Sequence, residues 1–335
     1  DEEIQKLIQL RVDTIHSYYN SIKKNNKFIN SNKNFIFTNS PINNAGLALS
    51  IISDEYKLKM FSFQHGITEE IVHNYNEGTI LNEINASDFF VSYNNLNYTY
   101  HNKLNSIYKK GAVLVAGMPD RNTSILRKKF KITNQKKIIF ISSNLYKGYF
   151  GQFSNSLSDY QRYKVEKNIV ENVLGKLKSN VTYKHYPETN YRFVDEDPIK
   201  EDISYLNNIE YIDNKIDLRY LLKSYNIFIT SKATSTISWP LLTNKPTILI
   251  NYSNNSPLSR EVYNLFDKAI FVYNYDDNNF EKNIISLLNL PYTEINKLWL
   301  DKQEDRKILI DKIFSSNLKD TEDLVYKYIK KNFLN

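Results

Sequence analysis

A histidine follows an apolar run near residue 60 and could do acid–base chemistry. His65 stands in the segment Gln64-His65-Gly66, directly after LKMFSF. A neutral imidazole raised by the tight turn that Gly66 permits could take a proton from a hydroxyl group. Glu69, one helical turn further, is a candidate carboxylate nucleophile. The alternative is that His65 caps the turn and Glu69 complements the dipole of the following helix.

A hydroxyl-rich turn lies between the apolar run NIFIT and the helical pattern ISWPLL. Its sequence is Ser231-Lys232-Ala233-Thr234-Ser235-Thr236. Backbone N–H groups at a helix start and Ser or Thr hydroxyls can point at the same phosphate oxygens. We therefore expect a phosphate to bind here, while one hydroxyl, of Thr234 or Ser235, caps the helix. The residues expected to bind the phosphate are Ser231, Thr234, Ser235 and Thr236.

Two other apolar runs end in polar residues that could hold a nucleotide. The candidates are Ser142, Ser143 and Asn144 after KIIFIS, and Lys184 and His185 at the end of VTYKH. Such side chains can contact the base, the ribose or the phosphate. The alternative for His185 is a turn residue, because a proline follows two positions later.

The acidic residues predict no metal site. Asp195-Glu196-Asp197 has the spacing of a D-x-D metal motif, but it lies among other acids before a proline and is interpreted as a solvated loop. Asp276-Asp277, in YNYDDNNF, is interpreted as a turn. The chain has no cysteine and no histidine pair at i, i+4, which argues against zinc. Asp120, in GMPDRN, is a second candidate carboxylate nucleophile.

Most of these candidates follow short apolar runs that are predicted to be strands. Such runs alternate with helical patterns along the chain. The predicted strands are 34–39, 58–63, 88–92, 112–116, 137–142, 181–185, 209–212, 226–230, 247–250 and 269–273. Helices are predicted over 1–26, 41–53, from 68, up to 108, over 159–177, 218–223 and 235–242, and from 280 to the C-terminus. This alternation predicts an α/β fold with parallel sheets, whose ligands bind beyond the carboxyl ends of the strands.

The strands fall into two sets, separated near residues 122–135. Two doubly wound, Rossmann-like domains that face a cleft are therefore expected. We assign residues 1–125 to an N-terminal domain, 126–290 to a C-terminal domain and 291–335 to C-terminal helices that could pack back across both. Trp239 and Trp299 are expected in the core.

Composition and missing motifs exclude several classes. The chain has 335 residues, 41% of them hydrophobic and 24% charged, which excludes a disordered chain and a small disulfide scaffold. It has no dinucleotide fingerprint after the first strand, no P-loop and no H-E-x-x-H or G-x-S-x-G motif. A net charge of +7 favours polyanionic partners or an anionic membrane surface, while the scattered lysines argue against nucleic acid. The amphipathic first helix could lie on such a surface or serve as a packing helix.

A family resemblance rests on six segments, which occur in the order QHG, SDFFVSYN, GMPDRN, KIIFISSN, KHYP and ITSKATSTISWPLLTNKPTILINY. This order resembles the GT-B glycosyltransferases of bacterial surface polysaccharide synthesis. It is similar to the capsule and lipopolysaccharide transferases that use CMP-activated ulosonic acids, Kdo or sialic acid. It also resembles the CDP-glycerol glycerophosphotransferases of teichoic acid synthesis. The resemblance covers residues from about 34 to 252, and its most specific part is 231–252.

The resemblance implies a metal-independent glycosyltransferase that needs no cofactor. It implies transfer of a sugar, Kdo or another ulosonic acid, from CMP to a bacterial surface glycan or lipid-linked glycan. By the same resemblance His65 lies on the acceptor side of the cleft, His185 contacts the cytidine nucleotide and 231–236 hold the donor phosphate. The enzyme would then be cytoplasmic, at the inner face of the cytoplasmic membrane.

Three alternatives stay open. The first is a CDP-polyol phosphotransferase of teichoic-acid type, which is weakened because those enzymes carry an Asp where this chain has Lys232 or Ala233. The second is a non-catalytic, transferase-like module of a larger polymerase. The third is a nucleotide-sugar epimerase of the same fold, which would form its product without an acceptor. The sequence does not decide between inversion and retention of configuration.

Overall fold

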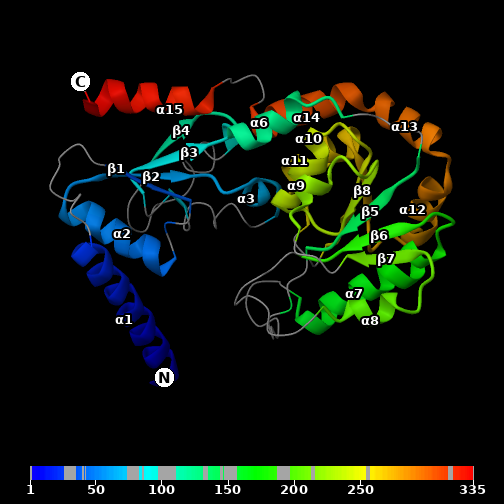
Figure 1. Ribbon diagram of the computed structural model, residues 1–335, viewed down its shortest axis with the longest axis horizontal. Helices are drawn as coiled ribbons and strands as arrows, with labels where there is room; N and C mark the ends of the chain where they lie inside the picture. Colours follow the sequence, from blue (N-terminus) through cyan, green and yellow to red (C-terminus); the bar gives the residue numbers. More distant parts are fainter. Residues whose placement is uncertain are drawn as a thin grey trace. The chain divides into compact units, whose positions relative to one another are not determined.

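The computed structural model (Figure 1) describes residues 2–25, 35–39, 41, 43–73, 83–84, 87–96, 111–130, 135–143, 146, 157–186, 197–212, 216–253, 257–315 and 320–334. The chain forms two compact units. Unit 1 comprises Asp1–Glu70, Asn74–Asp120 and Asp311–Asn335, and unit 2 comprises Ile71–His73 and Arg121–Ile310. Each unit contains one parallel sheet, so the predicted α/β class with two parallel-sheet domains is confirmed.

A four-stranded parallel sheet forms the middle of unit 1. Its strands are β1 (Phe35–Thr38), β2 (Lys59–Phe63), β3 (Phe89–Ser92) and β4 (Ala112–Val115), in the spatial order β1-β2-β3-β4. Among these described strands the order contains no reversal. Helix α2 (Asn44–Glu55) connects β1 to β2, and it begins where the side chain of Asn43 accepts a hydrogen bond from the Gly46 N–H at 2.6 Å.

Aromatic side chains make the core of this sheet. Phe61 is fully buried and stacks on Phe89 with ring centroids 4.7 Å apart. Helix α15 (Thr321–Ile329) adds Val325 and Ile329 to the same cluster, and the π-helical turn η5 (Lys330–Leu334) packs Phe333 against it. The end of the chain therefore belongs to the core of unit 1, and this burial ties it down.

Helix α1 (Glu2–Asn25) is the amphipathic helix expected at the start of the chain. None of its residues is buried, and Leu7 and Ile8 are 66% and 59% exposed. It is attached to α2 near its end, where the Lys23 ammonium lies 2.6 Å from the Glu55 carboxylate and Tyr19 donates to the same group. The apolar side of α1 thus buries no side chain within the described residues.

Unit 2 is built on six parallel strands. They are β5 (Ile138–Ile141), β6 (Val181–Lys184), β7 (Ile209–Ile212), β8 (Ile227–Thr230), β9 (Thr247–Asn251) and β10 (Phe271–Asn274). Their spatial order is β10-β9-β8-β5-β6-β7. The chain therefore moves outward from β5 to β7, returns to the middle at β8 and moves outward the other way. This is a doubly wound sheet, and the direction in which successive strands are added to it reverses between β5 and β8.

The sequence forms these strands because they are buried on both faces. Every residue of β5, β8 and β9 is buried, as the continuous apolar runs predict for a covered parallel sheet. Figure 1 shows α7 and α8 on one side of the sheet and α10 and α11 on the other. The helices and helical turns not yet named are α3 (Thr68–Ile71), α6 (Asp120–Arg127), α7 (Asp159–Asn172), η3 (Leu174–Lys176), α8 (Ile199–Ile203), α9 (Leu218–Leu221), η4 (Ser235–Ile237), α10 (Ser238–Leu242), α11 (Arg260–Ala269), α12 (Phe280–Asn289), α13 (Tyr292–Asp301) and α14 (Gln303–Phe314).

Two predicted helices are interrupted. The helix expected over 159–177 ends at Asn172 and continues as the 3₁₀ turn η3. Gly175 in that turn lies so close to its neighbours that an added Cβ would be 3.2 Å from the Leu206 side chain and 3.2 Å from the Val170 carbonyl oxygen, which favours glycine here. The helix expected over 235–242 is the 3₁₀ turn η4 followed by the single α-turn α10.

Candidate functional site

The carboxyl ends of β5, β6 and β8 lie side by side in unit 2, with β5 in the middle. Ile141 is in register with Lys184 of β6 and with Thr230 of β8. Neighbouring strands are about 4.8 Å apart, so the residues that end these strands share one edge of the sheet. The predicted residues that this register brings together are Ser142, Ser143, Lys184, His185 and Ser231. The edge includes the reversal between β5 and β8, where doubly wound sheets bind ligands.

Hydroxyl groups line this edge. Ser142 and Ser231 are buried, and the Ser142 N–H donates to the Lys184 carbonyl at 2.9 Å. Thr234 is the N-cap of η4, because its hydroxyl oxygen accepts from the Thr236 N–H at 3.4 Å. The capping prediction is therefore confirmed for Thr234. The hydroxyls of Ser235 and Thr236 are partly exposed at the same turn, where an anion could meet them.

Two lysines bring positive charge to the hydroxyls. Lys184 is 1% exposed, and burial lowers its pKa to about 8 although Asp217 opposes the shift. Burial, together with the nearby Arg162 guanidinium, lowers the pKa of Lys232 to about 8 against the effect of Glu166. Both ammonium groups are still mostly protonated at neutral pH. Because a phosphate would replace the solvation that these charges have lost, the edge is suited to anions.

Helix α7 contributes a buried carboxylate that sequence reasoning missed. Glu166 is 1% exposed, and one of its oxygens accepts from the Tyr146 hydroxyl at 3.2 Å. Arg162, one turn earlier, lies 3.7 Å from Asp159. Arg162 and Glu166 both act on Lys232, so the three form one charged cluster. The available signal was the i, i+4 spacing of Arg162 and Glu166 in a segment expected to be helical.

His185 belongs to an aromatic stack on one face of the sheet. Its ring lies 5.5 Å from that of Tyr211 at an interplanar angle of 11°, and Tyr211 stacks on Tyr183 at 5.5 Å. Asp197 accepts hydrogen bonds from both tyrosine hydroxyls, at 3.3 and 3.2 Å, and burial raises its pKa. The interpretation of 195–197 as a solvated loop is therefore wrong for Asp197, which is held by the tyrosines and by the Ile199 N–H at 3.1 Å. Asp195 and Glu196 lie outside the described residues.

One of the two tryptophans is not in the core. Trp299 is fully buried as expected. Trp239, at the start of α10, is only partly buried, and the guanidinium carbons of Arg121 and Arg219 lie 6.0 and 5.5 Å from its ring centroid. The reason is that two cations cover this ring where the prediction assumed apolar neighbours. Arg219 is itself oriented by Asp217, to which it donates twice at 2.9 Å.

In unit 1, two neighbouring residues of the QHG segment, Gln64 and His65, differ in burial and in role. Gln64 is buried, and its side-chain oxygen accepts from the Tyr93 N–H at 2.6 Å and from the Ser92 hydroxyl at 3.2 Å. It thereby joins the end of β2 to the end of β3. His65 is exposed at the carboxyl end of β2. Position and exposure allow its imidazole to exchange a proton with a ligand.

The predicted carboxylates of unit 1 lie in different settings. Asp120 is exposed as the first residue of α6, and its N–H donates to Glu322 at 3.3 Å. Glu70, which is not among the candidate nucleophiles, is 1% exposed, and its carboxylate accepts a hydrogen bond from the Asn94 side-chain amide at 3.0 Å. The side chain of Glu69 lies outside the described residues, as does Asn144 of the nucleotide candidates.

Among the described residues no three histidine, aspartate or glutamate side chains are placed to hold a metal ion together. The part of the chain that the structure describes also contains no helix that is both long and apolar enough to cross a membrane.

Comparison with known proteins identifies the fold. No family model matches the chain, and no curated protein matches it. A structure from Listeria monocytogenes, of a protein assigned as a UDP-N-acetylglucosamine 2-epimerase, matches 98% of this chain and 80% of its own at a TM-score of 0.54 and 9% identity. MnaA of S. aureus with UDP matches 93% and 82% at a TM-score of 0.49 and 10% identity. Anabaena HepE with UDP-glucose matches 88% and 78% at 0.49 and 12%. At such identities a likeness is one of architecture, and the chain shares the α/β fold of the Listeria protein.

Proposed function

We propose that the protein is a glycosyltransferase whose unit 2 binds the nucleotide of an activated sugar at the carboxyl ends of β5, β6 and β8. One observation carries this proposal. The register of the three strand ends gathers serine hydroxyls, the hydroxyl turn 231–236, the buried Lys184 and the partly buried Lys232 at the reversal of a doubly wound sheet. Convergent polar groups with lowered lysine pKa values at such a place are typical of a functional site.

The chemistry that this edge supports is departure of a nucleotide phosphate. As the bond between sugar and phosphate breaks, negative charge grows on the leaving phosphate. Lys184, Lys232 and the hydroxyls of 231–236 are groups that would stabilise that charge. His65 in unit 1 is the candidate base for the acceptor hydroxyl, and Asp120 or Glu69 is the candidate nucleophile if configuration is retained.

The donor that we propose is a CMP-activated ulosonic acid, with a surface glycan or lipid-linked glycan as acceptor. The support is the family resemblance of segments such as KHYP and 231–252. Lys232 or Ala233 also stands where a CDP-polyol transferase would carry an Asp, which disfavours that alternative. A second candidate is an epimerase that acts on a UDP-sugar. It is favoured by the assigned activity of the Listeria protein whose fold this chain shares.

A nucleotide panel followed by a product assay distinguishes these candidates. Thermal melting with CMP, CDP, UDP, GDP and ADP identifies the nucleotide, because a ligand at 100 times its Kd stabilises by about 2.7 kcal/mol. CMP or CDP is expected to stabilise and GDP to have no effect. Stabilisation by UDP alone would contradict the proposed donor, and formation of a new sugar from a UDP-sugar without acceptor would show an epimerase. No stabilisation by any nucleotide would contradict the whole proposal.

A further inference from the structure

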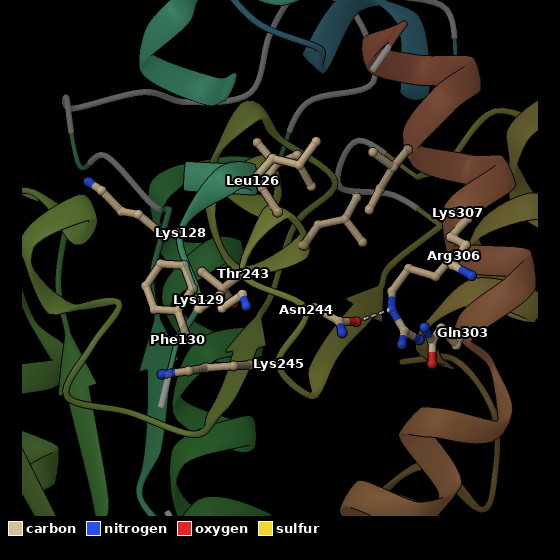
Figure 2. Close-up of a pocket in the computed structure, with 13 residues that line it drawn as sticks. Leu126, Lys128, Lys129, Phe130, Thr243, Asn244, Lys245, Gln303, Arg306 and Lys307 are labelled. Carbon is tan, nitrogen blue, oxygen red and sulfur yellow. Dashed lines mark hydrogen bonds between the residues drawn. The ribbon is translucent and has the colours of Figure 1, made fainter. Parts of the chain in front are cut away.

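A cavity lies in unit 2, at the edge of the sheet opposite the proposed donor site. It has a volume of about 520 Å³, which is in the range of small-ligand pockets. Thr243, Asn244 and Lys245, which line it, come just before β9 and therefore at the amino ends of the strands. Figure 2 shows Lys128, Lys129 and Phe130 on one side of it and Gln303, Arg306 and Lys307 on the other.

The charge of this cavity has one sign. Five of its lining residues are cationic and none is acidic; the cations are Lys128, Lys129, Lys245, Arg306 and Lys307. Lys307 already pairs with Glu304 at 2.7 Å. Among the described residues no carboxylate lies within ion-pair distance of the other four. A concave site with this charge concentrates anions, and its low-dielectric walls strengthen the attraction.

Two of the cations are buried, which is costly without a negative partner. Arg306 is 1% exposed and Lys245 is 2% exposed. Arg306 donates to the Asn244 side chain at 3.0 Å and to the carbonyls of Ala269 and Trp299 at 3.2 and 3.0 Å, but its buried Nη2 has no partner. Lys245 donates to two backbone carbonyls at 2.7 and 2.6 Å. Neutral acceptors and aromatic rings, with the Trp299 centroid 3.7 Å from the Arg306 guanidinium carbon and the Phe130 centroid 5.2 Å from the Lys245 ammonium, orient these groups but supply no negative charge, so an anion would stabilise both.

The rest of the lining is apolar. Leu126, Phe130, Leu241, Leu242 and Ile310 complete the wall of the cavity. An inorganic anion alone would leave this apolar surface exposed to water, whereas the organic part of a phosphate ester could cover it. Phosphate suits the cationic part, because guanidinium and ammonium groups make charge-assisted hydrogen bonds to several of its oxygens.

We propose that this cavity is a binding site for a phosphate ester, separate from the donor-nucleotide site. Arg306 holds the phosphate from one side of the cavity, Lys128 and Lys129 on the other side add attractive positive charge, and the organic group covers Leu126 and its apolar neighbours. The ester could be a phospholipid headgroup with its glycerol or a soluble phosphorylated metabolite, which share this chemistry. The site does not depend on the proposed transferase activity, because it uses none of the residues at the carboxyl ends of the strands.

Titration calorimetry with three probes tests the proposal. The probes are inorganic phosphate, dihexanoyl phosphatidic acid below its micellar concentration, and dihexanoyl phosphatidylcholine. Wild-type protein is expected to bind phosphatidic acid at least about tenfold more tightly than phosphatidylcholine. Phosphatidic acid should bind more tightly than inorganic phosphate because its organic part covers the apolar wall, and equal binding of the two would overturn the proposed place of the organic group. A further titration with glycerol 3-phosphate distinguishes the sources: binding as tight as that of phosphatidic acid indicates a soluble ester, and weaker binding indicates a lipid. Failure to bind either anion would overturn the proposal.

Variants locate the binding. Leu126→Trp fills the cavity without changing the charge, and the double variant K128Q/K129Q removes two exposed cations with little risk to folding. Both are expected to weaken anion binding at least about tenfold. The matched control is K176Q/K178Q, which removes two exposed lysines near β6 at the same edge of the sheet. Equal loss in that control, or loss in S235A/T236A with retention in Leu126→Trp, would place the anion elsewhere and refute the site.

Discussion

Replacing Lys232 with Met should weaken nucleotide binding and also change how that binding depends on pH. Lys232 follows Ser231 at the carboxyl end of β8, and burial together with Arg162 lowers its pKa to about 8. A bound phosphate places negative charge beside this ammonium group and therefore raises the pKa again. Above pH 8 the protein must take up a proton to bind, so the affinity of the wild type must fall as the pH rises.

The magnitude follows from the pKa of about 8. About 90% of Lys232 is protonated at pH 7 and about 10% at pH 9, so this group alone should reduce the affinity about tenfold over that interval. The nucleotide phosphate is already ionised there, since its second pKa is about 6. A charge-assisted hydrogen bond contributes about 1.5–3 kcal/mol, so Lys232→Met should weaken binding about 10- to 150-fold at pH 7.

Isothermal titration with CMP and with UDP at pH 7, 8 and 9, in buffers of different ionisation enthalpy, measures both affinity and proton uptake. Lys136→Met is the matched control, because burial also lowers the pKa of Lys136 but this lysine lies just before β5, at the amino-terminal edge of the same sheet and outside the second proposed site. Proton uptake should decrease in the Lys232 variant and persist in the control. Uptake unchanged by Lys232→Met would refute the placement of the phosphate beside this lysine.

Three further predictions concern stability, the division of roles and the surface. Without ligand, the free energy of unfolding should rise from pH 7 to pH 9, because the pKa values of Lys184 and Lys232 in the folded state lie below the unfolded value of about 10.4. Above pH 8 each lysine contributes at most about 1.4 kcal/mol per pH unit, and a thermal-melting series that is flat or falling would contradict this. Replacing Ser235 and Thr236 with Ala should weaken nucleotide binding about tenfold or more, whereas His65→Ala should leave nucleotide affinity unchanged and lower turnover about 10²-fold. If titration and turnover assays show the opposite pattern, the assignment of the donor and acceptor sides is wrong. The exposed apolar side of α1 and the net charge of +7 should bind the protein to anionic vesicles at low salt and release it at high salt, and absence from the vesicle pellet at low salt would reject this.

The strands of unit 2 could be predicted because burial on both faces leaves a simple trace in the sequence. IIFI and IFIT are continuous apolar runs, and every residue in them is buried. Helix ends were harder to place. The helix expected over 159–177 ends at Asn172, and the turn that follows packs Gly175 against Leu206, a contact with a distant segment that leaves no local pattern in the sequence. Strand order is likewise a tertiary property, and the reversal between β5 and β8 appears in no local pattern.

In the candidate site too, local sequence patterns could predict some residues, whereas residues brought together by tertiary contacts could not be predicted. Hydroxyls after β5 and β8 could be predicted, because polar residues that end buried parallel strands gather at one edge. The gathering of Glu166 and Arg162 around Lys232 could not, because it depends on where α7 lies relative to β8. Asp197 was misread for a similar reason. Its partners are tyrosines on β6 and β7, whose hydroxyls become neighbours only through the strand register.

The two interpretations of His65 can be weighed with the structure in hand. The sequence left open whether this residue caps a turn or faces a ligand. The buried side chain of Gln64 holds the turn after β2, since its amide donates to the Gly66 carbonyl at 2.9 Å and its oxygen accepts from the Tyr93 N–H at 2.6 Å. Gln64 is buried while the neighbouring His65 is exposed, so His65 is accessible to a ligand at the carboxyl end of β2. Gln64 therefore supplies hydrogen bonds that hold this turn, and the exposure of His65 supports the proposal that its imidazole serves the reaction.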